Sequence, residues 1–295
     1  MEILWLGHPD CHDVHRAGAK AASLSRLVTT YRIPPGFCIP TAAYTQWAED
    51  TGSGHGASPT QSIPAALYHA LESAYRDLAT MCEVTDLSVA VRSSAVDEDG
   101  ASRSFAGQYE TSLNVVGVDA VSEAVLRCWA SVCSERALAY RQGQGLSVAG
   151  VRLAVLVQQL VPADAAAVVF SANPVTGSRH EVVINAGWGL GESIVSGTVT
   201  PDTYIIRKAD LAVMTRDIAE KRRMTVLASA GTQEVPVPRQ RQRVPSIDDG
   251  QVIELARLAM ALEMTMGWPV DIECAYQGQA LHLLQCRPIT TLGAL

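Results

Sequence analysis

The chain has 295 residues, a hydrophobic share of 48% and a formal net charge of −7. This composition supports a sizeable core in one large domain or two modest lobes, and the negative charge argues against general affinity for nucleic acid. No apolar run approaches the ~20 residues of a membrane span, and the acidic start at Glu2 lacks the basic region of a signal peptide. Seven cysteines without a regular spacing predict reduced thiols and hence a cytoplasmic protein.

The first half of the chain is predicted to alternate helices with a few short strands. Apolar side chains at helical spacing favour a loop that enters a helix at 18–27, helices at 41–48 and 63–81, and one long amphipathic helix at 119–141. Strands are expected at 3–6, 88–91 and 151–161. The stretch 92–107 is too polar and carries too much glycine for a regular element.

The second half is predicted to be richer in strands, which are expected at 165–170, 181–185, 204–206 and 212–218. The arginine-rich stretch 222–243 is expected to be irregular. Ser246 and Asp249 have the spacing of a capping box, and the helix that they open is expected to end at Gly267. Two strands joined by a turn at Gly278 close the chain.

This closing hairpin carries polar residues on otherwise apolar strands. Glu273 lies on the first strand, and Gln285 and Arg287 lie on the second. Burying such groups is costly unless they are paired or bind a ligand. Mg²⁺ and a polyphosphate would satisfy them, because Glu273 and Gln285 offer hard oxygen ligands and Arg287 offers a fork for phosphate. From spacing alone, an edge hairpin whose polar residues face water is an equal alternative.

The register of the hairpin decides whether Glu273 and Gln285 can share an ion. A loop with an even number of residues would place them on opposite faces of the sheet. A three-residue loop at 277–279 instead predicts that Glu273 pairs with Leu283 and that Asp271 pairs with Gln285. Glu273 and Gln285 would then be diagonal neighbours about 7–8 Å apart, close enough to share an ion.

Three other stretches can be interpreted as nucleotide contacts, and each has a plain structural alternative. The loop 92–107 offers Arg92 and backbone amides freed by glycine, which can close over phosphates, or it is an ordinary surface loop. The motif at 189–192 lacks the spacing of dinucleotide or Walker glycines, so a tight turn is favoured. Residues 158–161 can present backbone groups to an adenine edge, or they form an edge strand.

In their order along the chain, these segments resemble the ATP-binding domain of the phosphoenolpyruvate synthase and pyruvate phosphate dikinase family, which includes rifampicin phosphotransferase. The matching segments are Val91-Arg92-Ser93-Ser94, 104–108, Asn173-Pro174, Gly189-Leu190-Gly191-Glu192, Pro201-Asp202, Asp271-Ile272-Glu273 and Gln285-Cys286-Arg287-Pro288. The resemblance extends from about residue 18 to 291. It implies an α/β (α+β) class and an ATP-grasp fold, with two lobes at 1–161 and 162–295 and the nucleotide in the cleft between them.

The resemblance also implies roles for individual residues. Lys20, Arg92 and Arg287 would be the catalytic cations that bind the phosphates of ATP, and Glu273 and Gln285 would ligate Mg²⁺. Further nucleotide contacts would come from the phosphate-covering Ser104, Ala106 and Gly107, from Gln159, Leu160 and Val161 around the adenine, and from Lys221 at a phosphate. The sequence departs mildly from the family pattern, without touching these ligands, at Ala19, Ala167, Ser171 and Cys274.

Typical members of this family fuse the domain to a swivelling domain whose histidine carries the phosphoryl group. None of the seven histidines here lies in that sequence context. The resemblance therefore implies a module that transfers a phosphoryl group from Mg·ATP to a histidine of a separate partner protein. The β-phosphoryl group would be transferred, leaving AMP and Pi. The alternatives are a kinase that phosphorylates a small molecule such as an antibiotic or a sugar directly, with ADP as product, and a non-catalytic nucleotide-sensing subunit.

Overall fold

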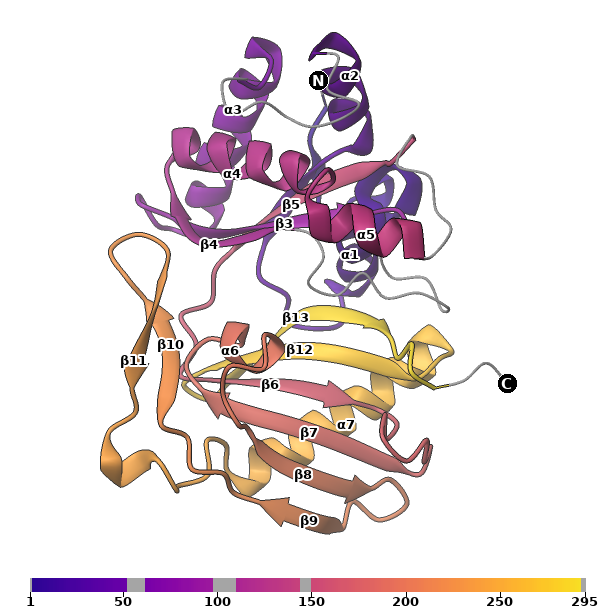
Figure 1. Cartoon of the computed structure of the whole chain (residues 1–295), viewed down its shortest axis with the longest axis vertical. Helices are drawn as coiled ribbons and strands as arrows, with labels where there is room; N and C mark the ends of the chain where they lie inside the picture. Colours follow the sequence, from indigo (N-terminus) through magenta and orange to yellow (C-terminus); the bar gives the residue numbers. More distant parts are fainter. Residues whose placement is uncertain (1, 52–61, 98–109, 144–149, 293–295) are drawn as a thin grey trace. The chain divides into compact units, whose positions relative to one another are not determined.

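The structure is a computed structural model that describes residues 2–51, 62–97, 110–143 and 150–292 (Figure 1). The chain divides into two compact units. The first comprises Met1–Leu160 with Ser229–Gly231, and the second comprises Val161–Ala228 with Thr232–Leu295. The mixture of helices and antiparallel sheets confirms the predicted α+β class. Among the described residues, no helix has the length and apolar character needed to cross a membrane.

The first unit is built on a five-stranded antiparallel sheet in the order β1-β2-β5-β3-β4. Its strands are β1 (Leu4–Trp5), β2 (Gly36–Ile39), β3 (Ser88–Ala95), β4 (Thr111–Val116) and β5 (Leu153–Gln159). Its helices are η1 (Pro9–His12), α1 (Val14–Leu27), α2 (Thr41–Thr51), α3 (Ala65–Met81), α4 (Val118–Ser131) and α5 (Glu135–Gly143). Apolar side chains of α2, α3 and α4 pack with the sheet into one core, in which the Trp47 and Trp129 rings lie 5.0 Å apart.

The predicted single helix at 119–141 is wrong, because the chain forms α4 and α5 with a break between them. Ser134 lies at this break and is the N-cap residue of α5. Its Oγ accepts a hydrogen bond from the Ala137 amide at 3.2 Å, which is the bond that an N-cap serine makes to the third residue of a helix. The apolar periodicity continues across the break, so periodicity alone did not reveal it.

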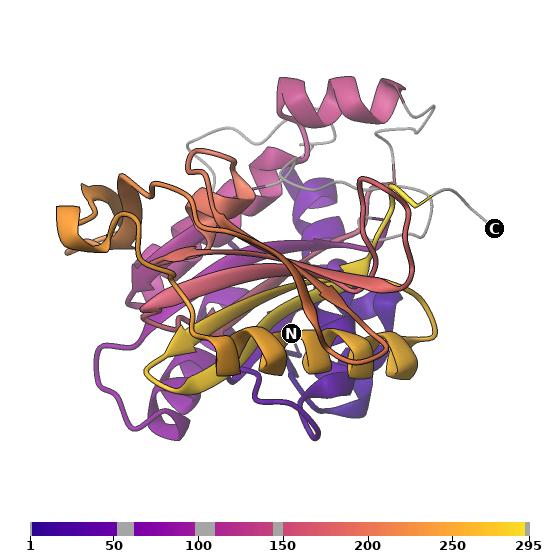
Figure 2. The same cartoon turned by 90° about the horizontal axis from the view of Figure 1, so that it is seen from below.

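The second unit is built on a six-stranded antiparallel sheet in the order β13-β12-β6-β7-β8-β9. Its strands are β6 (Ala165–Phe170), β7 (Glu181–Trp188), β8 (Asp202–Arg207), β9 (Val213–Asp217), β12 (Val270–Gln277) and β13 (Ala280–Pro288). Helix α7 (Asp249–Met266) crosses one face of this sheet (Figure 1, Figure 2). The short helix α6 (Glu192–Val195) packs against β6 and β7.

The segment 222–243 forms regular structure, so its prediction as irregular is wrong. Strands β10 (Arg223–Leu227) and β11 (Thr232–Pro236) pair as a hairpin, and η2 (Arg239–Arg241) follows. Most of the side chains of this hairpin are exposed or half-buried, and Thr225 is the buried exception. The hairpin therefore lacks the apolar alternation by which a half-buried strand is recognised in a sequence.

Helix α7 begins with a capping box, although not the predicted one. Asp248 is the N-cap, its carboxylate accepts from the Gln251 amide, and the Gln251 side chain accepts from the Asp248 amide. Ser246 instead donates its hydroxyl hydrogen to Asp202 at 2.8 Å. The predicted end of the helix is confirmed, because Gly267 adopts a φ of 77° as its left-handed C-cap.

The hairpin of β12 and β13 differs from its predicted register in an instructive way. Gln277 pairs with Ala280, so the loop has two residues, not the predicted three. A register shift between Glu273 and Cys274 then leaves one extra residue on β13. Such a bulge reverses the face of every residue beyond it. As a result, Glu273 pairs directly with Gln285. The two side chains share one face of the sheet although the loop has an even number of residues.

Candidate functional site

Four polar side chains meet on one face of the second unit's sheet. Glu273 pairs with Gln285, and the neighbouring pair on the same face is Asp271 with Arg287. The alternate residues of β12, including Ile272 and Cys274, are fully buried toward α7. The polar quartet therefore lies on the face opposite α7.

Arg287 is oriented by Asp271 within this quartet. Its Nε and Nη2 donate to Asp271 Oδ2 at 2.9 and 2.8 Å. The side chains are 17% and 9% exposed, so little water competes for this ion pair. A guanidinium presents five donors in a planar fork. The donors that do not face Asp271 can bind a second anionic group, such as a phosphate.

The pair of Glu273 and Gln285 offers one carboxylate and one amide oxygen, which are the hard ligands that Mg²⁺ prefers. Among the described residues, no group of three or more histidine, cysteine, aspartate and glutamate side chains could hold a metal. Mg²⁺ commonly takes one or two protein ligands and completes its shell with water and substrate phosphates. The residues present thus fit a metal that arrives with a phosphate ligand.

Cys274, which follows Glu273, has no part in such a metal site. Burial raises the pKa of the Cys274 thiol well above its ordinary value, and the neighbouring Cys286 and Glu273 raise this pKa further. The thiol therefore stays protonated at neutral pH and fills space beneath α7 as an apolar side chain. The ligand set on the opposite face remains one of oxygen atoms.

The first unit places Lys20 beside the strand that carries Arg92. Lys20 Nζ donates to the carbonyl of Ser93 on β3 at 3.2 Å. Ser94 Oγ donates to the Ala17 carbonyl at 2.9 Å and accepts from the Ala21 amide at 3.2 Å. These bonds fasten helix α1, which carries Lys20, to β3, the strand that carries Arg92.

Gly18 makes this close approach of α1 to β3 possible. It interrupts α1 with a φ of 72°, and a Cβ at this position would lie 1.8 Å from the carbonyl oxygen of Ser94. No other residue fits such a backbone approach. The sequence showed Gly18 only as part of a loop before a helix, whereas the helix begins at Val14.

The predicted adenine contacts lie at the end of β5. The amide of Gln159 donates to the Pro35 carbonyl at 2.9 Å, and the amide of Leu160 donates to the Ser88 carbonyl at 3.0 Å. Both amides are thus used within the first unit. Val161 is 5% exposed and is the first residue of the second unit. The predicted phosphate-covering residues Ser104, Ala106 and Gly107 lie outside the described residues.

Lys221 is buried, with 2% of its side chain exposed, and forms an ion pair with the fully buried Asp202. Its Nζ also donates to the Ala219 carbonyl at 3.0 Å. Asp202 in turn accepts hydrogen bonds from the amide and hydroxyl of Ser246, each at 2.8 Å, and from the Ala219 amide at 3.1 Å. This network explains the Pro201-Asp202 motif, for which the sequence had suggested no role.

The glycine-rich stretch that follows β7 lies against β10, with an isolated parallel bridge between Gly189 and Thr225. Gly189 has a φ of 75°, and a Cβ there would lie 2.3 Å from the Thr225 carbonyl oxygen. The same carbonyl accepts from the Leu190 amide at 2.9 Å. The stretch leads into α6, whose Glu192 carboxylate accepts from the Thr232 hydroxyl at 2.9 Å. The structure thus shows a bridge to β10 at Gly189, and the tight-turn interpretation of this motif is not confirmed.

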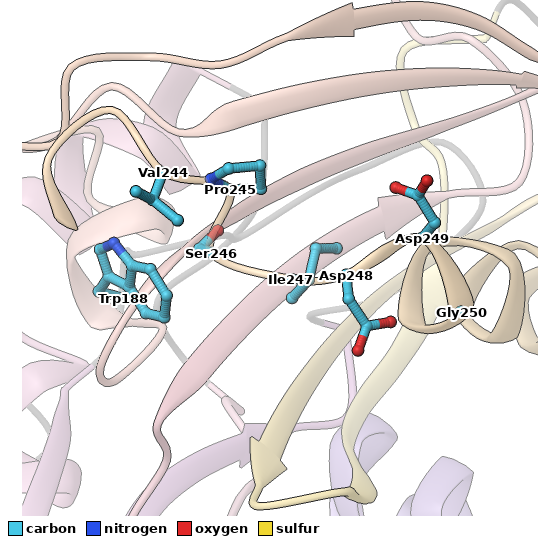
Figure 3. A pocket seen from close by; sticks show the side chains of 8 residues that line it. All are labelled: Trp188, Val244, Pro245, Ser246, Ile247, Asp248, Asp249 and Gly250. Carbon is cyan, nitrogen blue, oxygen red and sulfur yellow. The ribbon is translucent and has the colours of Figure 1, made fainter.

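A pocket of about 710 Å³ opens near the start of α7, and Figure 3 shows its lining. Its wall consists of Trp188 and the segment from Val244 to Gly250. The Arg241 guanidinium stacks on the Trp188 ring with 3.8 Å to the ring centroid. None of the predicted site residues lines this pocket, and the pairing of Trp188 with Ala165 places its ring on the α7 face of the sheet, away from Glu273 and Gln285.

Comparisons with known proteins agree with the resemblance found in the sequence. Residues 56–294 match the family model described as pyruvate phosphate dikinase, AMP/ATP-binding domain. The chain is 38% identical to a probable phosphoenolpyruvate synthase of Methanocaldococcus jannaschii, over 98% of this chain and 27% of that protein. It is 37% identical to a rifampicin phosphotransferase of a Streptomyces species, over 96% of this chain and 35% of that protein.

A third relative, the prodigiosin synthesizing transferase PigC of Serratia marcescens, is 40% identical over 94% of this chain and 32% of that protein. The chain thus spans between about a quarter and about a third of the length of these relatives. The similarity therefore concerns the part of each relative that corresponds to this chain.

Proposed function

The chain belongs to the family of pyruvate phosphate dikinase AMP/ATP-binding domains, and from this membership we propose that it acts as an ATP-dependent phosphotransferase module. The observation that carries the proposal is the direct pairing of Glu273 with Gln285 beside the ion pair of Asp271 and Arg287. The proposed metal ligands and the proposed phosphate-binding cation share one face of the sheet, which supports this function. This is the arrangement that phosphoryl transfer needs, because its catalysis consists mainly of positioning and electrostatic stabilisation.

In the proposed mechanism, Glu273 and Gln285 would hold Mg²⁺ beside the phosphates of ATP. The metal would supply positive charge that offsets the negative charge of those phosphates. Arg287, fixed by Asp271, donates hydrogen bonds to a phosphate oxygen and stabilises the charge that develops during transfer. Lys20 and Arg92 of the first unit bind the remaining phosphate oxygens. Gln159, Leu160 and Val161 line the adenine site, and Ser104, Ala106 and Gly107 cover the phosphates.

The acceptor in this proposal is a histidine of a partner protein or of a further domain. A neutral imidazole nitrogen attacks the β-phosphorus, the bond between that phosphorus and the oxygen bridging to the α-phosphate breaks, and AMP leaves with the bond's electrons. Hydrolysis of the β–γ linkage gives Pi and leaves phosphohistidine on the acceptor. The family membership supports this route, and the sequence context of the chain's own histidines provides no acceptor of the kind that the resemblance implies.

Product analysis tests this function. The chain is incubated with Mg·ATP and with candidate acceptor proteins encoded beside it, and nucleotides and phosphohistidine are quantified. We expect AMP, Pi and an acid-labile phosphoryl group on the acceptor. ADP with a phosphorylated small molecule would replace the proposal by a direct kinase. Tight binding of ATP without turnover beside any acceptor would leave a nucleotide sensor.

A matched pair of variants links this activity to the polar face. Glu273→Gln removes one carboxylate charge from the proposed Mg²⁺ site, and we expect phosphoryl transfer to fall about 100-fold or more. Glu234→Gln removes the same charge from the surface ion pair with Arg223 on the hairpin of β10 and β11. Its activity should match that of the unmodified chain. Equal activities of the two variants would remove Glu273 from the site.

A further inference from the structure

The polar pair of Glu273 and Gln285 belongs to a longer row across the sheet. Glu273 pairs on its other side with Val168 of β6, Val168 pairs with Asn185 of β7, and Asn185 pairs with Thr203 of β8. Directly paired residues of antiparallel strands point to the same face. Asn185 and Thr203 therefore share the face of Glu273 and Gln285, opposite α7. Neither was singled out in the sequence.

The row places Asn185 within reach of a ligand bound at Glu273. Neighbouring strands lie about 4.8 Å apart, so two strand spacings separate these residues by roughly 10 Å at the backbone. Both side chains rise from the sheet on the same side. A magnesium-bound triphosphate extends over several bonds from the metal, and its far phosphate groups can bridge this interval.

The hydrogen bond between Thr203 and Asn185 fixes what Asn185 offers to a ligand. The Thr203 hydroxyl donates to Asn185 Oδ1 at 3.0 Å. This bond orients the side-chain amide and leaves Nδ2 with two hydrogens to donate. Among the described residues no acceptor for Nδ2 is present, and Asn185 is half-buried. An amide held in this way complements an anionic oxygen.

The surroundings of the row leave Asn185 half-buried. Ile194 of α6 packs over Gly187, two residues further along β7, where an added Cβ would lie 3.3 Å from the isoleucine side chain. Asparagine is depleted in strands. The position of Asn185 in the middle of β7, on the row of Glu273, therefore indicates a functional role.

We propose that Asn185 donates hydrogen bonds to phosphate oxygens of the nucleotide whose metal ion Glu273 and Gln285 hold. Thr203 is a positioning residue that acts through Asn185 by fixing its amide. The inference rests on the proposed function, since it assigns further ligands at the same nucleotide site. It extends that site by two strands, from the closing hairpin into the middle of the sheet.

The test compares the affinities of the full chain and its variants for Mg·ATP and for adenosine by isothermal titration calorimetry. Asn185→Ala should weaken Mg·ATP binding about 10-fold, since a hydrogen bond to a charged oxygen is lost. Asn185→Asp should weaken it further, because a carboxylate repels phosphate. Adenosine affinity should stay the same in both, since no phosphate is present.

A second set of variants separates positioning from packing. Thr203→Val should reproduce most of the loss of Asn185→Ala, and Thr203→Ser should restore binding because it keeps the hydroxyl. Thr215→Val, on the exposed strand β9 and outside the row, is the matched control and should bind as the unmodified chain does.

Two results would overturn the inference while leaving the proposed function intact. In the first, the unmodified chain binds Mg·ATP and the Asn185 variants bind it equally well. In the second, the variants lose affinity for adenosine and Mg·ATP alike together with thermal stability, which indicates a structural role. If the unmodified chain fails to bind Mg·ATP, the proposed function itself fails and the inference falls with it.

Discussion

Two ion pairs of the second unit each join an aspartate to a cationic side chain, and their surroundings differ. Asp202 and Lys221 are almost fully buried, and Asp202 accepts additional hydrogen bonds from Ser246 and the Ala219 amide. Asp271 and Arg287 lie on the face opposite α7, beside Glu273 and Gln285, and remain partly exposed.

The difference suggests how to separate a structural ion pair from one that serves a site. Both charges of the first pair are compensated by protein groups. The pair therefore fastens the connecting segment 208–248, which lies between β8 and α7 in the sequence. The second pair combines a strong hydrogen-bonding geometry with access from one side. A cation that a carboxylate orients without enclosing it is suited to bind a ligand anion.

The largest expected effect follows from breaking the buried pair. Asp202→Ala leaves the Lys221 charge buried without its carboxylate, which typically destabilises a protein by about 3–5 kcal/mol. Urea titration followed by circular dichroism measures this loss. The matched control is Asp210→Ala, which breaks an exposed aspartate–arginine pair with Arg207 and should change the midpoint little. Similar midpoints for the two variants would contradict a fastening role for Asp202.

This pair also shows where sequence reasoning stops. Lys221 was predicted to contact a phosphate because the family resemblance placed it there, and no sequence pattern indicated that Asp202 lies next to it. The contact depends on how the connecting segment 208–248 folds back onto β8, and this is a property of the tertiary structure. The phosphate role of Lys221 stays a prediction, and its ion pair with Asp202 is the contact that the structure places there.

The next effect concerns the accessible pair and should appear in activity, not in stability. Arg287→Lys keeps the charge and loses the planar fork, so phosphoryl transfer should fall about 100- to 1,000-fold if Arg287 stabilises the transition state. Product formation from Mg·ATP gives the measurement. Arg223→Lys, at the surface pair with Glu234, is the matched control and should retain full activity. A large drop in the unfolding midpoint of Arg287→Lys would instead show that this ion pair, too, mainly stabilises the fold.

The closing hairpin shows how a prediction can reach the right face for an incomplete reason. The shared face of Glu273 and Gln285 was predicted from a three-residue loop, whereas the structure has a two-residue loop and a bulge. Alternation along a strand is local and readable, but a bulge depends on how the neighbouring strand pairs. The helices α3 and α7 were predicted well because their apolar periodicity is local. The break between α4 and α5 was missed because it depends on a single cap at Ser134.

The smallest of these effects tests the hydrogen bonds around Asp202. Ser246→Ala removes the hydroxyl that donates to Asp202 Oδ2 and keeps the backbone amide that donates to the same oxygen. Hydrogen bonds to charged groups contribute about 1.5–3 kcal/mol. Because the amide still satisfies the oxygen, we expect a loss near the lower end of that range in the urea titration, and unchanged phosphoryl transfer.

The double variant of Asp202→Ala and Ser246→Ala makes the interpretation sharper. If the serine acts through the carboxylate, its removal should cost almost nothing once Asp202 is absent, so the two losses should not add. Additive losses would show that Ser246 stabilises the start of α7 independently of Asp202. In that case Ser246 would not belong to the network of the buried pair, and the backbone of Ala219 would remain as its further partner.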